Sequence, residues 1–180
     1  MTVGLAIVVA AISACGTTTA SHTPAARSDR TALISYLRQV EPIRLAVNQL
    51  LEKADPILLG YRRARLSSTE AARLMNELER QFAAYTVAIA SIEPDTQALR
   101  KLQDAYAGTY ILEDAYLSAL VSGLEQRELG NLPNTQAAQR ATIIQWRTQL
   151  TVLARRVGVT LPSDLQQAGR GEVAPSPGGS

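Results

Sequence analysis

The chain has 180 residues, which is enough for one domain with a sizeable hydrophobic core. Alanine, leucine, arginine and glutamine are abundant and aromatic residues make up only 4%, a composition that favours helices over strands. The formal net charge of +2 is too small to indicate a nucleic-acid partner, and the single cysteine excludes an intrachain disulfide. We therefore expect an all-α protein.

The N-terminal residues show the pattern of an export signal followed by a cysteine. An apolar run over residues 3–12 leads into the tetrapeptide Ile12-Ser13-Ala14-Cys15, in which two small residues precede the thiol. The run is too short to span a bilayer, which needs about 20 apolar residues. The tetrapeptide resembles a lipobox, the motif at which bacterial lipoproteins are cleaved and acylated. The resemblance implies lipidation of Cys15 and attachment to the extracytoplasmic side of a cell membrane.

This resemblance divides the N-terminal region into residues 1–14 as a signal peptide and 15–28 as a flexible tether. Small and polar residues dominate the tether, and such a composition cannot build a core. No Lys or Arg precedes Arg27, whereas export signals usually begin with positive charge, so the natural start is expected to lie upstream or the signal to be weak. The alternative is an apolar N-terminal strand or helix that contains an unmodified cysteine.

The first helix is expected to begin near Ser28-Asp29 and to run to about Leu66. Apolar residues recur there every three or four positions, the spacing of a buried helix face: Leu33, Tyr36, Leu37, Val40, Ile43, Val47, Leu51, Ala54, Leu58 and Tyr61. Pro42 and Pro56 each lack an amide donor and clash with the preceding turn. We expect the helix to be kinked or broken at both prolines.

Two further helices follow, each with its own start and stop signals. Ser67 and Glu70 have the spacing of a capping box and predict the start of the second helix, which ends before Pro94. Asp95 is expected to cap the third helix. That helix is expected to continue to Leu129, with Gly130 as its C-terminal stop.

The fourth helix follows a turn at residues 132–134 and ends at Gly158 and Pro162. Its inward-facing residues are expected to be Ile143, Trp146, Leu150, Leu153 and Val157. Short loops between long amphipathic helices favour antiparallel neighbours. We therefore predict an up-down-up-down four-helix bundle over residues 29–165, followed by a disordered tail rich in Gly, Pro and Ser over residues 166–180.

Basic residues are concentrated in the first and fourth predicted helices. Residues 29–66 contain seven basic and four acidic side chains, and residues 134–157 contain four arginines and no acid. The second and third helices carry a net negative charge, which favours electrostatic pairing between neighbouring helices. The alternative is a basic face for anionic lipid or polymer. The expected partners are a membrane, through the lipid anchor, and an envelope protein or anionic polymer, with no nucleic acid.

Catalytic and metal-binding motifs are absent from the sequence. The single histidine, His22, lies in the predicted tether, so a site that needs histidine for a metal, a haem or a nucleophile cannot form in the bundle. Glycine-rich phosphate loops are also missing. We expect no metal and no cofactor. The leading hypothesis is a non-enzymatic interaction or structural module of the cell envelope.

A carboxylate interrupts the apolar face of the third helix. Glu113 falls within about 20° of the centre of that face, and a carboxylate buried alone is costly. Counting residues from the turns of an ideal bundle places Arg147 and the Tyr61-Arg62 pair within about one helical turn of it. We expect a buried salt bridge that fixes helix register, or alternatively a polar pocket for an anionic or hydroxylated small ligand. The candidate residues are Glu113, Arg147, Arg62, Tyr61, Tyr106 and Tyr116.

Overall fold

The computed structural model describes residues 24–165 and 173–176. The predicted signal peptide and Cys15 lie outside the described residues, as does most of the predicted tail. The described chain is all-α and contains no strand. Its elements are α1 (Pro24–Leu51), α2 (Ala54–Arg62), α3 (Ser68–Ala90), α4 (Gln97–Gln126), α5 (Gln136–Val157) and the 3₁₀ turn η1 (Ser163–Leu165).

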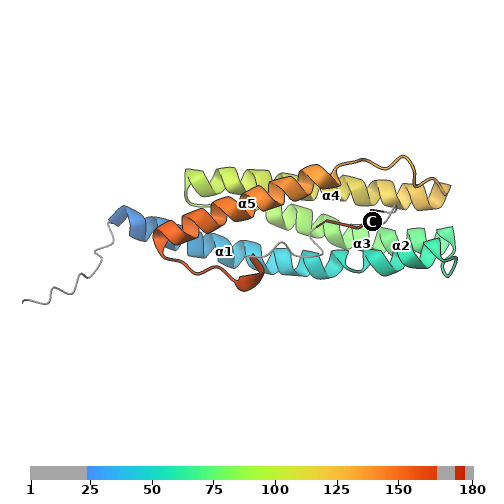
Figure 1. Cartoon of the computed structure of the whole chain (residues 1–180), viewed down its shortest axis with the longest axis horizontal. Helices are drawn as coiled ribbons and strands as arrows, with labels where there is room; N and C mark the ends of the chain where they lie inside the picture. The colour runs from blue at the N-terminus through green and yellow to red at the C-terminus, as the bar shows by residue number, and fades with distance from the viewer. Residues whose placement is uncertain (1–23, 166–172, 177–180) are drawn as a thin grey trace, which may run out of the picture.

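The two N-terminal helices α1 and α2 lie end to end, so that the chain forms four helical rods that run up and down in a bundle (Figure 1). The predicted four-helix bundle is confirmed. All inward positions predicted for the fourth helix are buried in α5, which shows that the 3.6-residue apolar period located its core face correctly.

The predicted interruption of the first helix is found before Pro56. The rod bends by 13° at residues 52–53, between α1 and α2. A proline ring collides with the carbonyl four residues earlier, and for Pro56 that carbonyl belongs to Glu52. Pro42 lies inside α1, which is not broken there.

The first rod also differs from its prediction at both ends. It begins at Pro24, so residues 24–28, which were assigned to the tether, are helical. Proline fits the first position of a helix because the amide that it lacks has no partner there. The rod ends at Arg62, four residues before the predicted Leu66, and Ala64 adopts a positive φ of 53° in the following turn.

The capping predictions are partly confirmed. The Ser67 hydroxyl accepts a hydrogen bond from the Glu70 amide at 3.2 Å, as predicted. The cap of α4 is Thr96 rather than Asp95, because the Thr96 hydroxyl accepts from the amide of Leu99.

The predicted end of the third helix at Leu129-Gly130 is wrong. The helix α4 ends at Gln126, because Arg127 takes the left-handed conformation with φ of 61°. The Glu128 amide then donates to the Gly123 carbonyl at 2.8 Å, a bond typical of a Schellman turn.

Gly158 ends α5 as predicted, with φ of 67°. A side chain in this conformation is strained, so we expect Gly158→Ala to lower the free energy of unfolding by about 1–2 kcal/mol. Gly130→Ala is the matched control, because no atom lies within 4 Å of the added methyl group and its backbone has no positive φ. Chemical denaturation of both variants measures the difference. Equal effects of the two substitutions would contradict this explanation.

A chain of buried polar groups links all four rods. The Trp146 indole of α5 donates to the Tyr36 hydroxyl of α1 at 3.0 Å, and that hydroxyl donates to the Gln103 amide oxygen of α4 at 2.9 Å. The Gln103 amide nitrogen donates to the carbonyl of Ile89 in α3. Because each link has directional partners in a buried environment, this chain of bonds sets the register of the rods.

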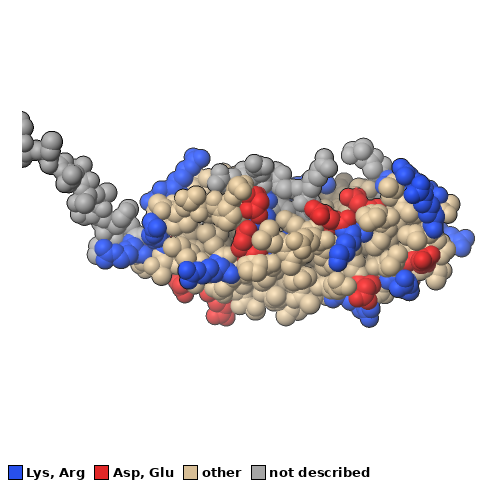
Figure 2. Space-filling model, turned by 90° about the horizontal axis from the view of Figure 1, so that it is seen from below, with Lys and Arg blue, Asp and Glu red and all other residues tan. Residues whose placement is uncertain are grey.

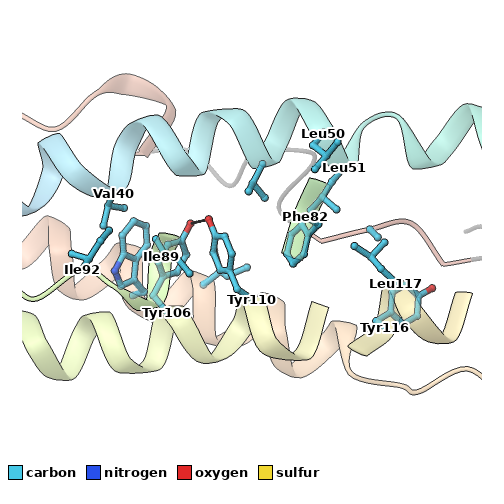
Figure 3. Packing of buried hydrophobic residues seen from close by; sticks show 14 of the residues in the cluster. Val40, Leu50, Leu51, Phe82, Ile89, Ile92, Tyr106, Tyr110, Tyr116 and Leu117 are labelled. Atoms are coloured by element: carbon cyan, nitrogen blue, oxygen red, sulfur yellow. Dashed lines mark hydrogen bonds between the residues drawn. The ribbon is translucent and has the colours of Figure 1, made fainter. Parts of the chain in front are cut away.

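Aromatic rings pack beside this polar chain. The Tyr106 ring stacks on Trp146 with a centroid distance of 4.1 Å and meets the Tyr110 ring edge-on at 5.4 Å. Figure 3 shows the hydroxyls of Tyr106 and Tyr110 pointing toward each other from α4, at 3.4 Å. Phe82 of α3 stacks on Tyr110 and continues the aromatic row. The centre of the bundle is therefore built from large rings that are buried together.

A buried arginine joins the C-terminal turn to α1. Arg44 is only 1% exposed and forms ion pairs with Glu41 and with Asp164 of η1. Burial disfavours the guanidinium charge, but the two carboxylates outweigh it and raise the pKa of Arg44 above its ordinary value. This contact holds the turn after α5 against the first rod.

The connection between α4 and α5 determines what covers the middle of α4. Residues 127–135 lead back along the bundle before α5 begins, so α5 starts beside the middle of α4 (Figure 1). Leu129 and Leu132 in this connection pack against the core, which explains its path. The C-terminal half of α4 consequently lacks α5 as a neighbour.

The segment Val173–Ser176, named here the C-terminal strap, lies against α4 near the start of α5. Its Ala174 is fully buried and forms hydrogen bonds to both helices. These four residues fall within the predicted disordered tail, and in the structure they pack on the bundle. The reason is local: Val173 and Ala174 contribute apolar surface, which the average composition of the tail conceals.

Candidate functional site

The buried carboxylate of Glu113 is the centre of the candidate site. Glu113 lies on the inner face of α4 and is 3% exposed, as its place on the apolar face predicted. It lines a small cavity to which all four rods contribute. The other lining residues are Val47, Asn48, Phe82, Tyr106, Thr109, Tyr110 and Ile143.

Three side chains of the bundle bind the backbone of the C-terminal strap. The Ala174 amide donates to Glu113 Oε1 at 2.6 Å, and Gln136 Nε2 at the start of α5 donates to the Ala174 carbonyl at 2.6 Å. The Tyr116 hydroxyl donates to the Pro175 carbonyl at 3.1 Å. We name Glu113, Tyr116 and Gln136 the strap site. Each of these side chains forms a hydrogen bond with a backbone group of the strap rather than with one of its side chains.

Burial dominates the electrostatics of Glu113. Desolvation raises its pKa to about 7, against the opposing effects of the Ala174 amide, the Gln139 side chain and the charge of Arg140. Its second carboxylate oxygen, Oε2, has no hydrogen-bond partner. A buried carboxylate in this state is costly when ionised, so the carboxyl group takes up a proton near neutral pH.

Tyr116 shares this environment. Burial raises its pKa to about 12, the nearby charge of Glu113 adds to the rise, and Gln136 opposes it. The phenol therefore stays protonated and serves as a hydrogen-bond donor to the strap throughout the physiological pH range.

The cavity beside Glu113 has a volume of about 10 Å³. That is roughly the space that one water molecule requires. Pockets for small organic ligands measure about 300–1,000 Å³. The alternative of a small-ligand pocket around Glu113 therefore gains no support from the geometry.

The structure brings together only some of the predicted site residues. Tyr116 lies in the strap site, and Tyr106 lines the cavity while stacking on Trp146. Arg147 is buried one turn beyond Ile143, but it is not among the groups that shift the pKa of Glu113. It lines a separate hollow along α5 instead.

Tyr61 and Arg62 lie far from the cavity. They are in α2, 13 residues beyond Asn48, which corresponds to about 20 Å along the rod. The sequence prediction placed Tyr61 and Arg62 beside Glu113 because it assumed that short turns bring the ends of neighbouring helices to the same level. The long connection over residues 127–135 displaces α5 by two to three turns, so Gln139 and Ile143, rather than Leu150, lie near Glu113.

The sequence prediction lacked several residues that the structure places at the strap site or in the buried polar contacts of the bundle. Gln136 and the strap were overlooked because their meeting depends on the offset of α5. Arg44 and Gln103 were not predicted to be buried, because Glu113 was the only polar residue that the prediction assigned to an apolar helix face. Their spacing could have indicated burial, because Arg44 lies four residues after Val40 and Gln103 lies one residue after Leu102 on the apolar faces of their helices.

Within the part of the chain that the structure describes, no helix is long and apolar enough to cross a bilayer. Over the same residues, no group of three or more His, Cys, Asp or Glu side chains is arranged to hold a metal ion. The lipidation site Cys15 lies outside the described residues.

Comparisons with known proteins give no relative from which a role could be transferred. No protein-family model matches the chain, and no curated protein and no solved structure matches it.

Proposed function

We propose that the chain is an exported lipoprotein whose helical bundle acts as a non-enzymatic interaction module, held at the extracytoplasmic face of a cell membrane by lipid on Cys15. The observation that carries the proposal is the lipobox-like tetrapeptide Ile12-Ser13-Ala14-Cys15, in which the only cysteine of the chain occupies the acylation position. Two acyl chains anchor a protein stably, whereas a single chain binds only marginally. Lipoprotein-type modification would supply a diacylglycerol.

The architecture of the bundle supports attachment at one end. Cys15 lies nine residues before Pro24, at which α1 begins. The start of α1 is at one tip of the elongated bundle (Figure 1). An anchor on Cys15 would therefore hold the bundle by this tip and leave the sides of its helices accessible to a partner.

The charges on one face of the bundle favour a protein partner over an anionic polymer. Figure 2 shows that, on the face it displays, Lys and Arg side chains are interspersed with Asp and Glu across the described residues. A polymer of one charge is bound by a continuous patch of the opposite sign. The mixed charges of this face suit a protein partner that contributes both charges.

Substitution of Cys15 tests the anchor. We expect Cys15→Ser to move the protein from the membrane fraction to the aqueous fraction of its native cell, because the acylated thiol is lost. Thr17→Ala is the matched control, since it alters a small polar residue just beyond the motif and keeps the thiol. Equal membrane association of Cys15→Ser and the wild type would refute the proposal.

A further inference from the structure

We infer that the strap site is a peptide-binding site, filled in this chain by its own Val173–Ser176, and that an extended partner segment with a small residue at the position of Ala174 binds there by displacing the strap. This inference rests on the proposed function in one respect: an interaction module needs a site for its partner.

The first argument is the chemistry of the contacts. Glu113 accepts from a strap amide, while Gln136 and Tyr116 donate to two successive strap carbonyls. Donors and acceptors thus match both kinds of group on a peptide backbone. Such a set recognises any extended segment that offers the same pattern, and the buried position of Ala174 selects a small side chain.

The second argument is the cost of the polar groups that line the site. A segment that only covered the core would need apolar contacts, as at most other buried positions of α4. Here a carboxylate is buried with one oxygen unpaired, and the other oxygen is bonded to the strap amide. A buried carboxylate at this position lowers the stability of the fold. In return, its oxygen gives the site specificity for a peptide amide.

The third argument is the small size of the strap contact. Among the described strap residues only Ala174 is fully buried, and its side chain is a single methyl group. Three hydrogen bonds, one methyl group and the half-buried Val173 hold much less strongly than a packed helix. The strap is therefore expected to leave the site by local opening, without unfolding of the bundle.

The test follows the binding of the peptide acetyl-Val-Ala-Pro-Ser-amide to the full chain by NMR, through the amide signals of Glu113 and Tyr116. In the wild type the strap competes at a high effective concentration, so we expect weak binding. Ala174→Asp would bury a second carboxylate beside Glu113 and expel the strap. We expect this variant to bind the peptide at least about tenfold more tightly than the wild type does.

Ser176→Asp is the matched control, because it adds the same charge at an exposed strap position. We expect it to bind the peptide as weakly as the wild type. In the Ala174→Asp background, Tyr116→Phe should weaken peptide binding about fivefold through loss of one hydrogen bond. Equal affinities of Ala174→Asp and Ser176→Asp would overturn the inference.

Hydrogen exchange of the wild type provides a second test that holds even if Ala174→Asp fails to fold. We expect the Ala174 amide to exchange faster than the amides in the middle of α4, because the strap opens locally. Exchange as slow as that of the α4 core would show that the strap is a fixed part of the fold, and would overturn the inference. Both tests use protein in solution, so their failure leaves the anchor at Cys15 untouched.

Discussion

Glu113→Gln is expected to stabilise the protein at about pH 8 by about 3 kcal/mol. Burial raises the pKa of Glu113 to about 7 from its ordinary 4.5. The folded state therefore binds the proton more tightly than the unfolded state does. The favourable contribution of the protonated carboxyl group is fully present below about pH 4.5 and is lost as the pH rises through about 7. Each unit of pKa shift corresponds to about 1.4 kcal/mol, which gives the expected size.

Glutamine retains an oxygen that can accept from the Ala174 amide, and it carries no charge at any pH. Denaturation curves at about pH 5 and pH 8 measure the effect, and the advantage of Glu113→Gln should shrink to under about 1 kcal/mol at the lower pH. Glu125→Gln is the control, because it removes a carboxylate from an exposed position of the same helix. A destabilised Glu113→Gln at pH 8 would show that the ionised carboxylate stabilises the fold.

Tyr36→Phe is expected to lower the free energy of unfolding by about 2–4 kcal/mol. The hydroxyl of Tyr36 accepts from Trp146 and donates to Gln103, and all three side chains are buried. Its removal leaves an indole N–H and an amide oxygen without partners in the core. Each unsatisfied buried group costs about 1–3 kcal/mol. Urea denaturation gives the measurement.

Tyr85→Phe is the matched control, since it removes a hydroxyl from a half-buried tyrosine of α3, and we expect a change within about 0.5 kcal/mol. A double variant with Trp146→Phe should cost less than the sum of the two single variants, because the indole donor is then gone as well. Strict additivity would indicate that Tyr36 and Trp146 are not coupled.

The sequence predicted the helices well because their apolar faces repeat with a clear period. Leu33, Val40 and Val47 of α1 and Trp146 and Leu150 of α5 are buried as expected. Boundaries were less accurate where two residues offered similar signals, as with Asp95 and Thr96. The end of α4 could not be predicted, because Arg127 is a residue type that rarely takes a positive φ.

The candidate site was predicted only in part because its assembly depends on tertiary structure. The period of α4 located Glu113 on the buried face, but its neighbours depend on how far α5 slides along α4. That offset comes from the packing of Leu129 and Leu132 in a connection that was predicted to be a short turn. The position of the strap depends on the same offset, since Ala174 lies where α5 leaves α4 uncovered.

Mass spectrometry of the native protein tests the central proposal most directly, through the molecule's own N-terminus. Protein would be extracted from the membranes of its natural host and its N-terminal peptide analysed intact. The proposal predicts a chain that begins at Cys15 with acyl chains attached to that residue. A peptide that retains residues before Cys15 and carries a free thiol would contradict it.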